Sequence, residues 1–330
     1  MKYYRDMKNK YNVLVVPAGS GMAYSAINKL KEDSKINVIS ADADKLAPGL
    51  YLSNKAYKIP PFSDKKFYDS LLTIIKKEEV DIIIPALDPI LLDFSIKRKL
   101  FRSYGAITLI SNSNTIKITR DKWLTYKKLK NHVPFPNSFI ALHDINIDYP
   151  LFIKPREGSG SKNTYKIINC KDLDFYFNSI HNPIIQEYLP GKEYTVDCLA
   201  DKQGNLAVCI SRERIETKCG ISIKGKIVKF AEIQEIAQKI TENLKFFGPF
   251  FFQLKEDQCG KLKIMEINPR ISGTMSLSSA SGINIHSLAV RMAMGEKISI
   301  LPIKSGIYVT RYWEDIYLED EDISNITEIN

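Results

Sequence analysis

Cysteine and histidine are scarce in this 330-residue chain, and neither is spaced as a metal site would require. The five cysteines form no C-x-x-C pair, and their odd number does not suit a disulfide framework. The four histidines share no metal-ligand spacing, so we expect them on the surface or in packing roles. The sequence therefore predicts reduced thiols in a cytoplasmic protein.

Long apolar runs are absent as well, which argues against a membrane as partner. No run approaches the ~20 residues that a bilayer-spanning helix needs, and the polar start lacks the apolar core of a signal peptide. Lysine and arginine outnumber the acids by 47 to 38, a formal charge of +9. These cations are spread along the chain without a basic, aromatic stripe, so nucleic acid is not an expected partner. The excess of positive charge favours the binding of small anions such as nucleotides and phosphorylated metabolites.

Short apolar segments alternate with amphipathic ones in the first third of the chain. Strands are expected at residues 11–16, 36–40, 81–85 and 106–110, with helices at 22–30, 65–77 and 90–100. This alternation predicts an α/β fold with a doubly wound parallel sheet. We expect this first domain to span residues 1–112.

The pattern of the remaining residues, 113–330, predicts a second domain of the α+β class. A single helix is expected over 115–130, followed by strands at 151–154, 164–168, 184–187, 249–254 and 263–267, and by helices at 232–244 and 285–294. We expect a small subdomain over 113–185 and a larger one over 186–330. The acidic stretch 314–330 is expected to be loosely held.

Two glycine-bearing segments have the composition of phosphate-binding loops. Gly19 and Gly21 lie between a strand and a helix, where amides could cradle a phosphate and Asp42 could hold a ribose. The full dinucleotide pattern is missing, so NAD binding is the minor interpretation of a turn that needs glycine anyway. The segment IKPREGSGS at 153–161 delivers cations into a loop that could close over a polyphosphate, or it is a flexible hairpin with solvated cations.

Polar side chains interrupt two other apolar segments. The segment IIQEYLPGKE at 184–193 could offer backbone groups to an adenine and the Glu193 carboxylate to a ribose, or it is a strand end with surface glutamates. Glu266 and Asn268 are two apart at a strand end and therefore share a face, while Gln253 interrupts a run of phenylalanines on the preceding strand. Such oxygen ligands suit Mg²⁺ bound with phosphates, and the alternative is a buried hydrogen-bond network.

These segments together resemble the ATP-grasp superfamily, in its carbamoyl-phosphate-synthase-large-subunit-like branch. The most specific stretch is MEINPRISGTMSLSSASG at 265–282, and Asp121–Lys122, Lys154–Pro155–Arg156 and the 186–193 segment occur in the expected order. The resemblance implies an N-terminal pre-ATP-grasp domain followed by a grasp fold of two subdomains, with ATP and one or two Mg²⁺ ions, for which Mn²⁺ could substitute.

The resemblance also implies a role for each matching residue. Arg270 and Lys154 would be catalytic, acting on the transferred phosphoryl group, and Gln253, Glu266 and Asn268 would hold the metal. The ATP-binding residues would be Lys122, Lys154, Arg156, Gly158, Ser159, Gly160, Ser161, Gln186, Glu187, Tyr188, Leu189, Glu193 and Lys218.

Two departures from the branch narrow the expected activity. Carbamoyl phosphate synthases have two grasp units where this chain has one, and Gly273 replaces an arginine that they use on bicarbonate. We therefore expect a carboxylate–amine, or carboxylate–thiol, ligase that works through an acyl phosphate and forms ADP and phosphate. Arg212 and Arg214 would bind an anionic substrate group or form a solvated cationic face.

Other activities and states remain open from the sequence. The same scaffold could phosphorylate a small molecule or form carboxyphosphate without ligation, or serve as a non-catalytic nucleotide-binding module. Small-molecule carboxylates and amines are the expected partners, and a homodimer is an open alternative to a monomer.

Overall fold

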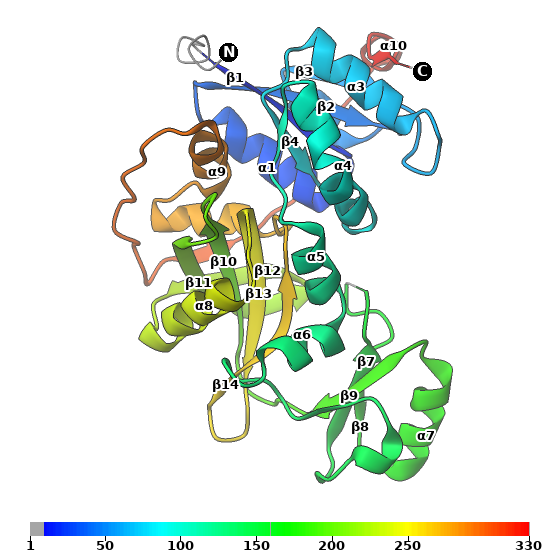
Figure 1. The fold of residues 1–330 in the computed structure, drawn as a ribbon, viewed down its shortest axis with the longest axis vertical. Coiled ribbons are helices and arrows are strands. Elements are labelled where there is room, and N and C mark those ends of the chain that lie inside the picture. Colours follow the sequence, from blue (N-terminus) through cyan, green and yellow to red (C-terminus); the bar gives the residue numbers. More distant parts are fainter. Residues whose placement is uncertain (1–9, 159, 330) are drawn as a thin grey trace.

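The computed structural model describes residues 10–158 and 160–329. The described residues form three sheets, two of six strands and one of four. Figure 1 shows the parallel sheet near both chain ends, a larger antiparallel sheet below it, and the small sheet at the opposite end of the long axis. Among the described residues, no helix combines the length and the apolar character that crossing a bilayer would take.

The N-terminal sheet is parallel and doubly wound, as predicted. Its order is β16 (Thr327–Glu328), β3 (Lys55–Lys58), β2 (Ile36–Asp42), β1 (Tyr11–Val16), β4 (Ile82–Pro85) and β5 (Ile107–Thr108). Val13 and Val15 of β1 pack with α1 (Gly21–Lys31), whereas Leu14 and Val16 pack on the other face with α3 (Phe67–Lys77) and α4 (Leu91–Ser103). The short α2 (Pro48–Leu52) and β3 were not expected.

The single helix expected over residues 115–130 is wrong, because the chain breaks at Asp121. The structure has α5 (Ser113–Arg120) and α6 (Lys122–Leu129), with Asp121 extended between them at φ −100 and ψ 114. The Asp121 carboxylate accepts hydrogen bonds from the amides of Trp123, at 2.8 Å, and Leu124, at 3.2 Å. A side chain that caps a new helix satisfies amides that a continuous helix would satisfy internally.

The expectation of a loosely held C-terminal stretch is also wrong where the chain reaches the N-terminal sheet. The acidic run forms α10 (Asp320–Ser324), and β16 then pairs in parallel with β3. Ile326 is buried, and Glu328 lies 2.7 Å from the Lys45 ammonium group. Residues from the predicted second domain therefore complete the sheet of the first.

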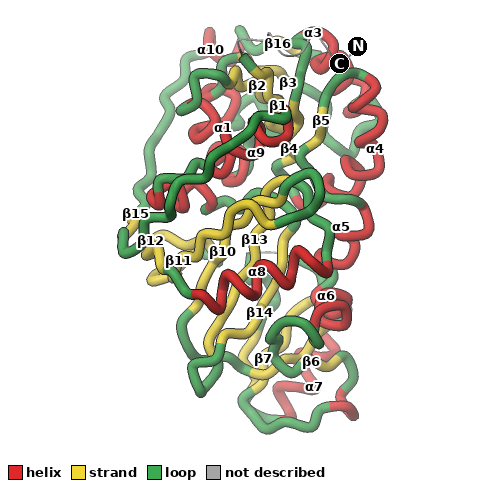
Figure 2. Tube along the Cα trace, turned by 60° about the vertical axis from the view of Figure 1, so that its left-hand side comes forward, coloured by secondary structure: helices red, strands yellow, loops and turns green. Residues whose placement is uncertain are grey.

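The large sheet is antiparallel and carries most of the candidate site. Its order is β14 (Leu262–Asn268), β13 (Gly248–Glu256), β10 (Glu193–Ala200), β11 (Leu206–Lys218), β12 (Ile221–Val228) and β15 (Tyr308–Thr310). The helix α8 (Ala231–Asn243) covers one face, where it crosses the strands in Figure 2. The turns η3 (Met275–Ser281) and the helix α9 (Ile285–Met294) cover the other.

The small antiparallel sheet projects beyond β14. Its order is β6 (Ser138–Phe139), β9 (Pro183–Glu187), β7 (Leu151–Pro155) and β8 (Tyr165–Ile167). The helix α7 (Cys170–Ser179) and the turn η2 (Leu142–Asp144) pack on it, with Leu151, Ile153 and Ile185 at the centre of this core.

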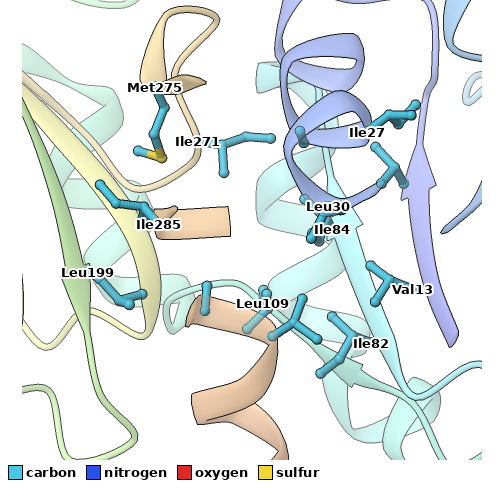
Figure 3. Close-up of a cluster of buried hydrophobic side chains, with 14 of the residues drawn as sticks. Val13, Ile27, Leu30, Ile82, Ile84, Leu109, Leu199, Ile271, Met275 and Ile285 are labelled. Carbon is cyan, nitrogen blue, oxygen red and sulfur yellow. The ribbon is translucent and has the colours of Figure 1, made fainter. Parts of the chain in front are cut away.

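One hydrophobic core joins the parallel sheet to the large antiparallel sheet. Figure 3 shows side chains of β1, α1 and β4, among them Ile27 and Ile84, facing Ile271, Met275 and Ile285. Burial of this continuous apolar surface holds the two sheets together. The turn η1 (Asp88–Ile90), which follows β4, is thereby fixed close to the end of β14.

Candidate active site

Two lysines lie close together beside β14, the strand that carries the predicted metal ligands Glu266 and Asn268. Lys154 on β7 is buried, and its Nζ donates to the carbonyl of Met265 at 3.2 Å. Lys122 begins α6, and its Nζ donates to the carbonyl of Gly158 at 3.1 Å. Burial, together with the charge of Lys122, lowers the pKa of Lys154 to about 7, although Glu266 and Glu193 offset part of the effect. An anion entering here would relieve the cost of these two cations.

The carbonyl that Lys154 contacts lies in a β-bulge. Gln253 pairs with Glu266 and Leu254 pairs with Ile264, so Met265 is the extra residue of β14. Bulges re-aim side chains and interrupt the ladder of a sheet. This one leaves the Met265 carbonyl to Lys154 and sets Glu266 opposite Gln253.

Gln253, Glu266 and Asn268, the predicted metal ligands, are brought together. Besides the Gln253–Glu266 pairing, the Asn268 Nδ2 donates to Glu266 Oε1 at 3.1 Å. No group of three His, Cys, Asp or Glu side chains suited to a metal occurs in the described ranges. A single carboxylate with two amides fits Mg²⁺ only when phosphate oxygens complete the shell, which is the usual mode for nucleotide-bound Mg²⁺.

The glycine loop lies beside these groups and against a long hairpin. Gly158 and Gly160 have φ of 128° and 75°, conformations that favour glycine. A Cβ added to Gly220, between β11 and β12, would lie 3.0 Å from Ser161 Oγ. Lys218 ends β11 in the same hairpin and is exposed. Ser159, also predicted to bind ATP, lies outside the described residues.

Arg156 does not join the two lysines. Its guanidinium binds the Asp121 carboxylate through Nε at 3.1 Å and through Nη2. The backbone carbonyl of Arg156 accepts from the amide of Lys122 at 3.0 Å. Arg156 therefore ties the start of the glycine loop to the start of α6.

The predicted hinge residues follow β9, but their side chains are engaged differently. The carboxylate of Glu187 accepts from Lys263 Nζ at 2.6 and 2.7 Å, which links β9 to β14. Gln186 is buried, and its Nε2 donates to Ser138 Oγ at 2.8 Å inside the small sheet. The side-chain amide of Gln186 is therefore held inside the small sheet by one of its two N–H donors.

Further residues of the hinge segment line the space between the small and large sheets. The Lys166 ammonium lies 4.4 Å from the ring centroid of Tyr188, and Leu189 is buried. Glu193, the first residue of β10, lies 3.0 Å from Arg214 Nε. The carboxylate predicted to bind ribose is thus half-buried and oriented by a cation.

The interpretation of Arg212 and Arg214 as a solvated cationic face is wrong. Arg212 is fully buried, and its Nη2 binds Thr274 Oγ1 at 2.9 Å and Asp197 at 3.5 Å. Its Nε and Nη1 have no hydrogen-bond partner in the part of the chain that the structure describes. Burial lowers the pKa of Arg212, and Asp197 offsets part of that effect. Arg214 Nη2 donates to the Gly220 carbonyl at 2.7 Å and so braces the hairpin.

Arg270 is paired with an acid from the N-terminal sheet. Its Nη2 lies 2.8 Å from Asp88 Oδ2, and its Nε contacts Asp88 Oδ1. The Nη1 donates to the carbonyl of Ile271 at 2.9 Å. The guanidinium, predicted to act on the phosphoryl group, therefore has three of its five N–H donors bound to protein groups.

A cavity of about 240 Å³ connects these groups. The cavity is lined by Lys122 and Gly158, and by the predicted metal ligands Glu266 and Asn268. Asp88 of the N-terminal domain lines it as well. Its apolar wall comes from Leu91, Leu92 and Ile116. The cavity thus places a polar, charged end beside an apolar one.

Three acids at the site were not among the predicted site residues. Asp121 caps α6, Asp197 accepts from Arg212 and Ser272, and Asp88 binds Arg270. Asp88 follows the buried strand β4, and the carboxyl ends of parallel strands are where sites form in α/β folds. The position of Asp88 directly after a predicted buried strand was the signal in the sequence that could have identified it. Asp197 interrupts the apolar strand β10, a pattern that marks a polar group needing partners.

Two protein-family models match parts of the chain. The model described as PylC-like, N-terminal domain matches residues 13–110. The model described as ATP-grasp in the biosynthetic pathway with Ter operon matches residues 179–314. Together they cover the parallel sheet except β16 and the first two residues of β1, and the whole of the large sheet, including β14 with the predicted metal ligands.

Similarity to curated relatives and solved structures extends over more than half of the chain. The carbamoyl phosphate synthase large chain of Clostridium botulinum strain Kyoto is 24% identical over 92% of this chain and 31% of its own length. The D-alanine–D-alanine ligase of Petrotoga mobilis is 25% identical over 58% of this chain and 69% of its own. N5-carboxyaminoimidazole synthetase from Staphylococcus aureus, solved with ADP, has a TM-score of 0.71 at 20% identity, covering 88% and 80%. The chain spans only 16% to 31% of the synthase large chains that it matches.

Proposed function

This chain carries an ATP-grasp domain behind a PylC-like N-terminal domain, and we propose that it is an ATP-dependent ligase. In the proposed reaction a carboxylate oxygen attacks the γ-phosphorus of ATP, which gives an acyl phosphate and ADP. An amine or a thiol, after losing a proton to water, then attacks the acyl carbon, and phosphate leaves with the electrons of the broken carbon–oxygen bond. The relative named D-alanine–D-alanine ligase supports this reaction class.

The observation that carries the proposal is the electrostatic state of Lys154. A buried ammonium whose pKa has fallen to about 7 beside Lys122 is costly without an anion. Glu266 and Asn268 lie on the adjoining strand. Oxygens of the same anion would therefore also coordinate a metal ion held by these two residues. A nucleotide triphosphate meets both requirements.

We propose that Gln253, Glu266 and Asn268 hold one or two Mg²⁺ ions, for which Mn²⁺ could substitute. The bound metal would supply positive charge that offsets the charge developing on the phosphate oxygens. Arg270, once released from Asp88, would stabilise the transferred phosphoryl group together with Lys154.

The proposed nucleotide site continues from the phosphates to the hinge. The loop 157–161 and Lys218 would close over the phosphates from two sides, since the hairpin that bears Lys218 approaches the loop so closely that a Cβ on Gly220 would lie 3.0 Å from Ser161 Oγ. Backbone groups of Glu187–Leu189 would contact adenine, and Glu193 would accept the ribose hydroxyls. Arg156 would support the loop through Asp121 rather than bind phosphate.

We propose that Arg212 binds the carboxylate donor. Its buried Nε and Nη1 are donors awaiting an acceptor, and a buried unpaired donor costs about 1–3 kcal/mol. Arg214 would act indirectly by holding the hairpin and Glu193.

Ligation is favoured over carboxyphosphate formation by the shape of the cavity. Its apolar wall of Leu91, Leu92 and Ile116 would have no partner if bicarbonate were the substrate. We place the enzyme in the cytoplasm, where the five unpaired cysteines would remain reduced. Its assembly as a monomer or homodimer is a separate question for light scattering.

The test is ADP release across a panel of carboxylates, each paired with a panel of amines. Hydroxylamine serves as a general acceptor, because it traps an acyl phosphate as a coloured hydroxamate. We expect ADP and hydroxamate in equal amounts, both dependent on Mg²⁺ and carboxylate. ADP release that needs no carboxylate, or that yields a stable phosphorylated product instead of hydroxamate, would contradict a ligase.

A further inference from the structure

The contact between Arg270 and Asp88 restricts what Arg270 can do for the phosphoryl group. Both oxygens of Asp88 bind the guanidinium, and the arginine side chain is only 9% exposed. With the bond to the Ile271 carbonyl, three of the five N–H donors are in use, and the edge formed by Nε and Nη2 faces Asp88. Phosphate can be held by that two-donor edge only in exchange for Asp88.

Loss of Arg270 would leave the Asp88 carboxylate without its cation in the cavity. Asp88 is 37% exposed, and Leu91, Leu92 and Ile116 form the apolar wall beside it. A half-buried carboxylate that loses its partner loses a favourable charge interaction, and its exposure to water makes that loss smaller than for a fully buried pair. A new cation at Asp88 would restore the interaction.

The other acids of the cavity are already matched by protein groups. Glu157 lies 2.7 Å from Arg120 Nε. Glu266 accepts from Asn268 and raises the pKa of nearby Lys154, which shows its favourable interaction with that cation. Asp88 is thus the cavity acid whose ion pair the proposed reaction would break.

We propose that Asp88 binds the ammonium group of the acceptor substrate, and that nucleotide binding prepares it by drawing Arg270 away. The substrate class is a cationic amine with an apolar body, since the ammonium site adjoins an apolar wall. This assignment rests on the proposed ligase function. Asp88 makes a binding contact only, and no bond is formed or broken at its carboxylate.

The exchange of partners predicts an order of binding. In the free protein Arg270 occupies the ammonium site, so the amine binds weakly. When Mg²⁺ and a non-hydrolysable ATP analogue are present, Arg270 leaves the Asp88 carboxylate. The amine then binds to Asp88 more tightly. This is a reciprocal coupling, and its size is bounded by the difference in affinity between the two states.

Asp88→Asn tests the assignment, with Asp93→Asn as its matched control. Asp93 lies on α4, is exposed, and accepts a long hydrogen bond of 3.4 Å from Tyr68. The probes are the amine of the productive pair found by the panel and hydroxylamine, which is neutral near physiological pH. Asp88→Asn should raise the KM of the cationic amine at least about tenfold. The same change should lower kcat with hydroxylamine by a much smaller factor.

Calorimetry supplies a readout that does not depend on turnover. Wild type should bind the amine more tightly with the Mg²⁺-bound ATP analogue than without it, and Asp88→Asn should lose that difference. Asp88→Glu should recover part of it. If Asp88→Asn lowers the hydroxylamine and amine reactions equally, the residue only positions Arg270, and the proposal is overturned. Absence of hydroxamate in wild type would instead reject the ligase function itself.

Discussion

Lys154 on the small sheet donates a hydrogen bond to the backbone carbonyl of Met265, 3.2 Å away on the edge strand of the large sheet. Met265 is available because it is the bulged residue of β14, between the pairs Gln253–Glu266 and Leu254–Ile264. The contact joins the two sheets across the proposed nucleotide site. It also keeps an ammonium group buried beside Lys122, and the first two predictions follow from that burial.

Lys154→Met should stabilise the free protein at low pH. The folded pKa of about 7 lies below the ordinary value of 10.5, so between these values the unfolded chain binds more protons. The contribution of Lys154 to the free energy of unfolding therefore rises with pH. Below about pH 7 the lysine is charged in both states, and its destabilising effect is complete. We expect a gain on the order of 2–4 kcal/mol at about pH 6 that shrinks towards about pH 10. Chemical denaturation of both proteins at several pH values measures it, and a pH-independent gain would contradict the burial of a titrating lysine.

Nucleotide binding should take up a proton. A triphosphate beside Lys154 restores its pKa, so at about pH 8 the neutral lysine of the free protein becomes charged on binding. We expect an uptake approaching one proton near pH 8 and little near pH 6. Calorimetry in buffers of different ionisation enthalpy gives the number. The uptake should vanish in Lys154→Met, and an equal uptake in that variant would assign the proton elsewhere.

Glu266→Gln should separate a metal ligand from a member of a structural network. The change keeps the shape and removes the charge, so we expect a fold close to wild type, weaker Mg²⁺ dependence and activity lower by at least about 10²-fold. ADP production and a thermal melt are measured on one preparation. Glu235→Gln, on the exposed face of α8, is the control. A destabilised variant with full activity would show that the metal assignment is wrong.

Arg212→Met should act on the carboxylate rather than on the nucleotide. The variant removes the unpartnered Nε and Nη1, so we expect the KM of the carboxylate to rise at least about tenfold with little change in ATP affinity. A purely structural arginine would behave differently, because breaking its pair with Asp197 lowers stability without changing KM. A melt and the two KM values, measured with Thr274 and Asp197 intact, distinguish these roles.

Ile326→Ala should destabilise the protein although it lies close to the C-terminal end. Ile326 is 8% exposed and packs with Leu50 under the strand pair β3–β16. We expect a loss on the order of 2 kcal/mol, the usual cost of emptying a buried aliphatic position. Ile316→Ala removes the same atoms at a position that is 39% exposed. Equal, negligible effects from the two changes would restore the picture of a loosely held C-terminal stretch.

Hydrophobic periodicity located many elements because it reflects which face of each element is buried. The strand Tyr11–Val16 and the helix Ile285–Met294 have the predicted bounds, and the alternation of strands with helices correctly implied a doubly wound parallel sheet. The same reasoning placed Glu266 and Asn268 together, since residues two apart on a strand share a face. Their roles as metal ligands stay predictions.

Periodicity could not show where a polar side chain would interrupt a helix or a ladder. Asp121 ends one helix and caps the next because Arg156, from another strand, holds its carboxylate in place. The bulge at Met265 leaves a carbonyl that Lys154, from another sheet, contacts. In both cases the interruption coincides with a contact that exists only in the folded chain.

The sequence by itself determined the strand and helix pattern, the doubly wound N-terminal sheet and the order of the nucleotide-type motifs, because these depend on local periodicity and on residue type. Tertiary structure alone decided which charges meet. Asp88 reaches Arg270 across 182 positions, Lys154 lies beside Met265, and Arg212 is buried with two unpartnered nitrogens. Electrostatic interactions depend on distance and burial in space, and neither quantity can be read from separation along a chain.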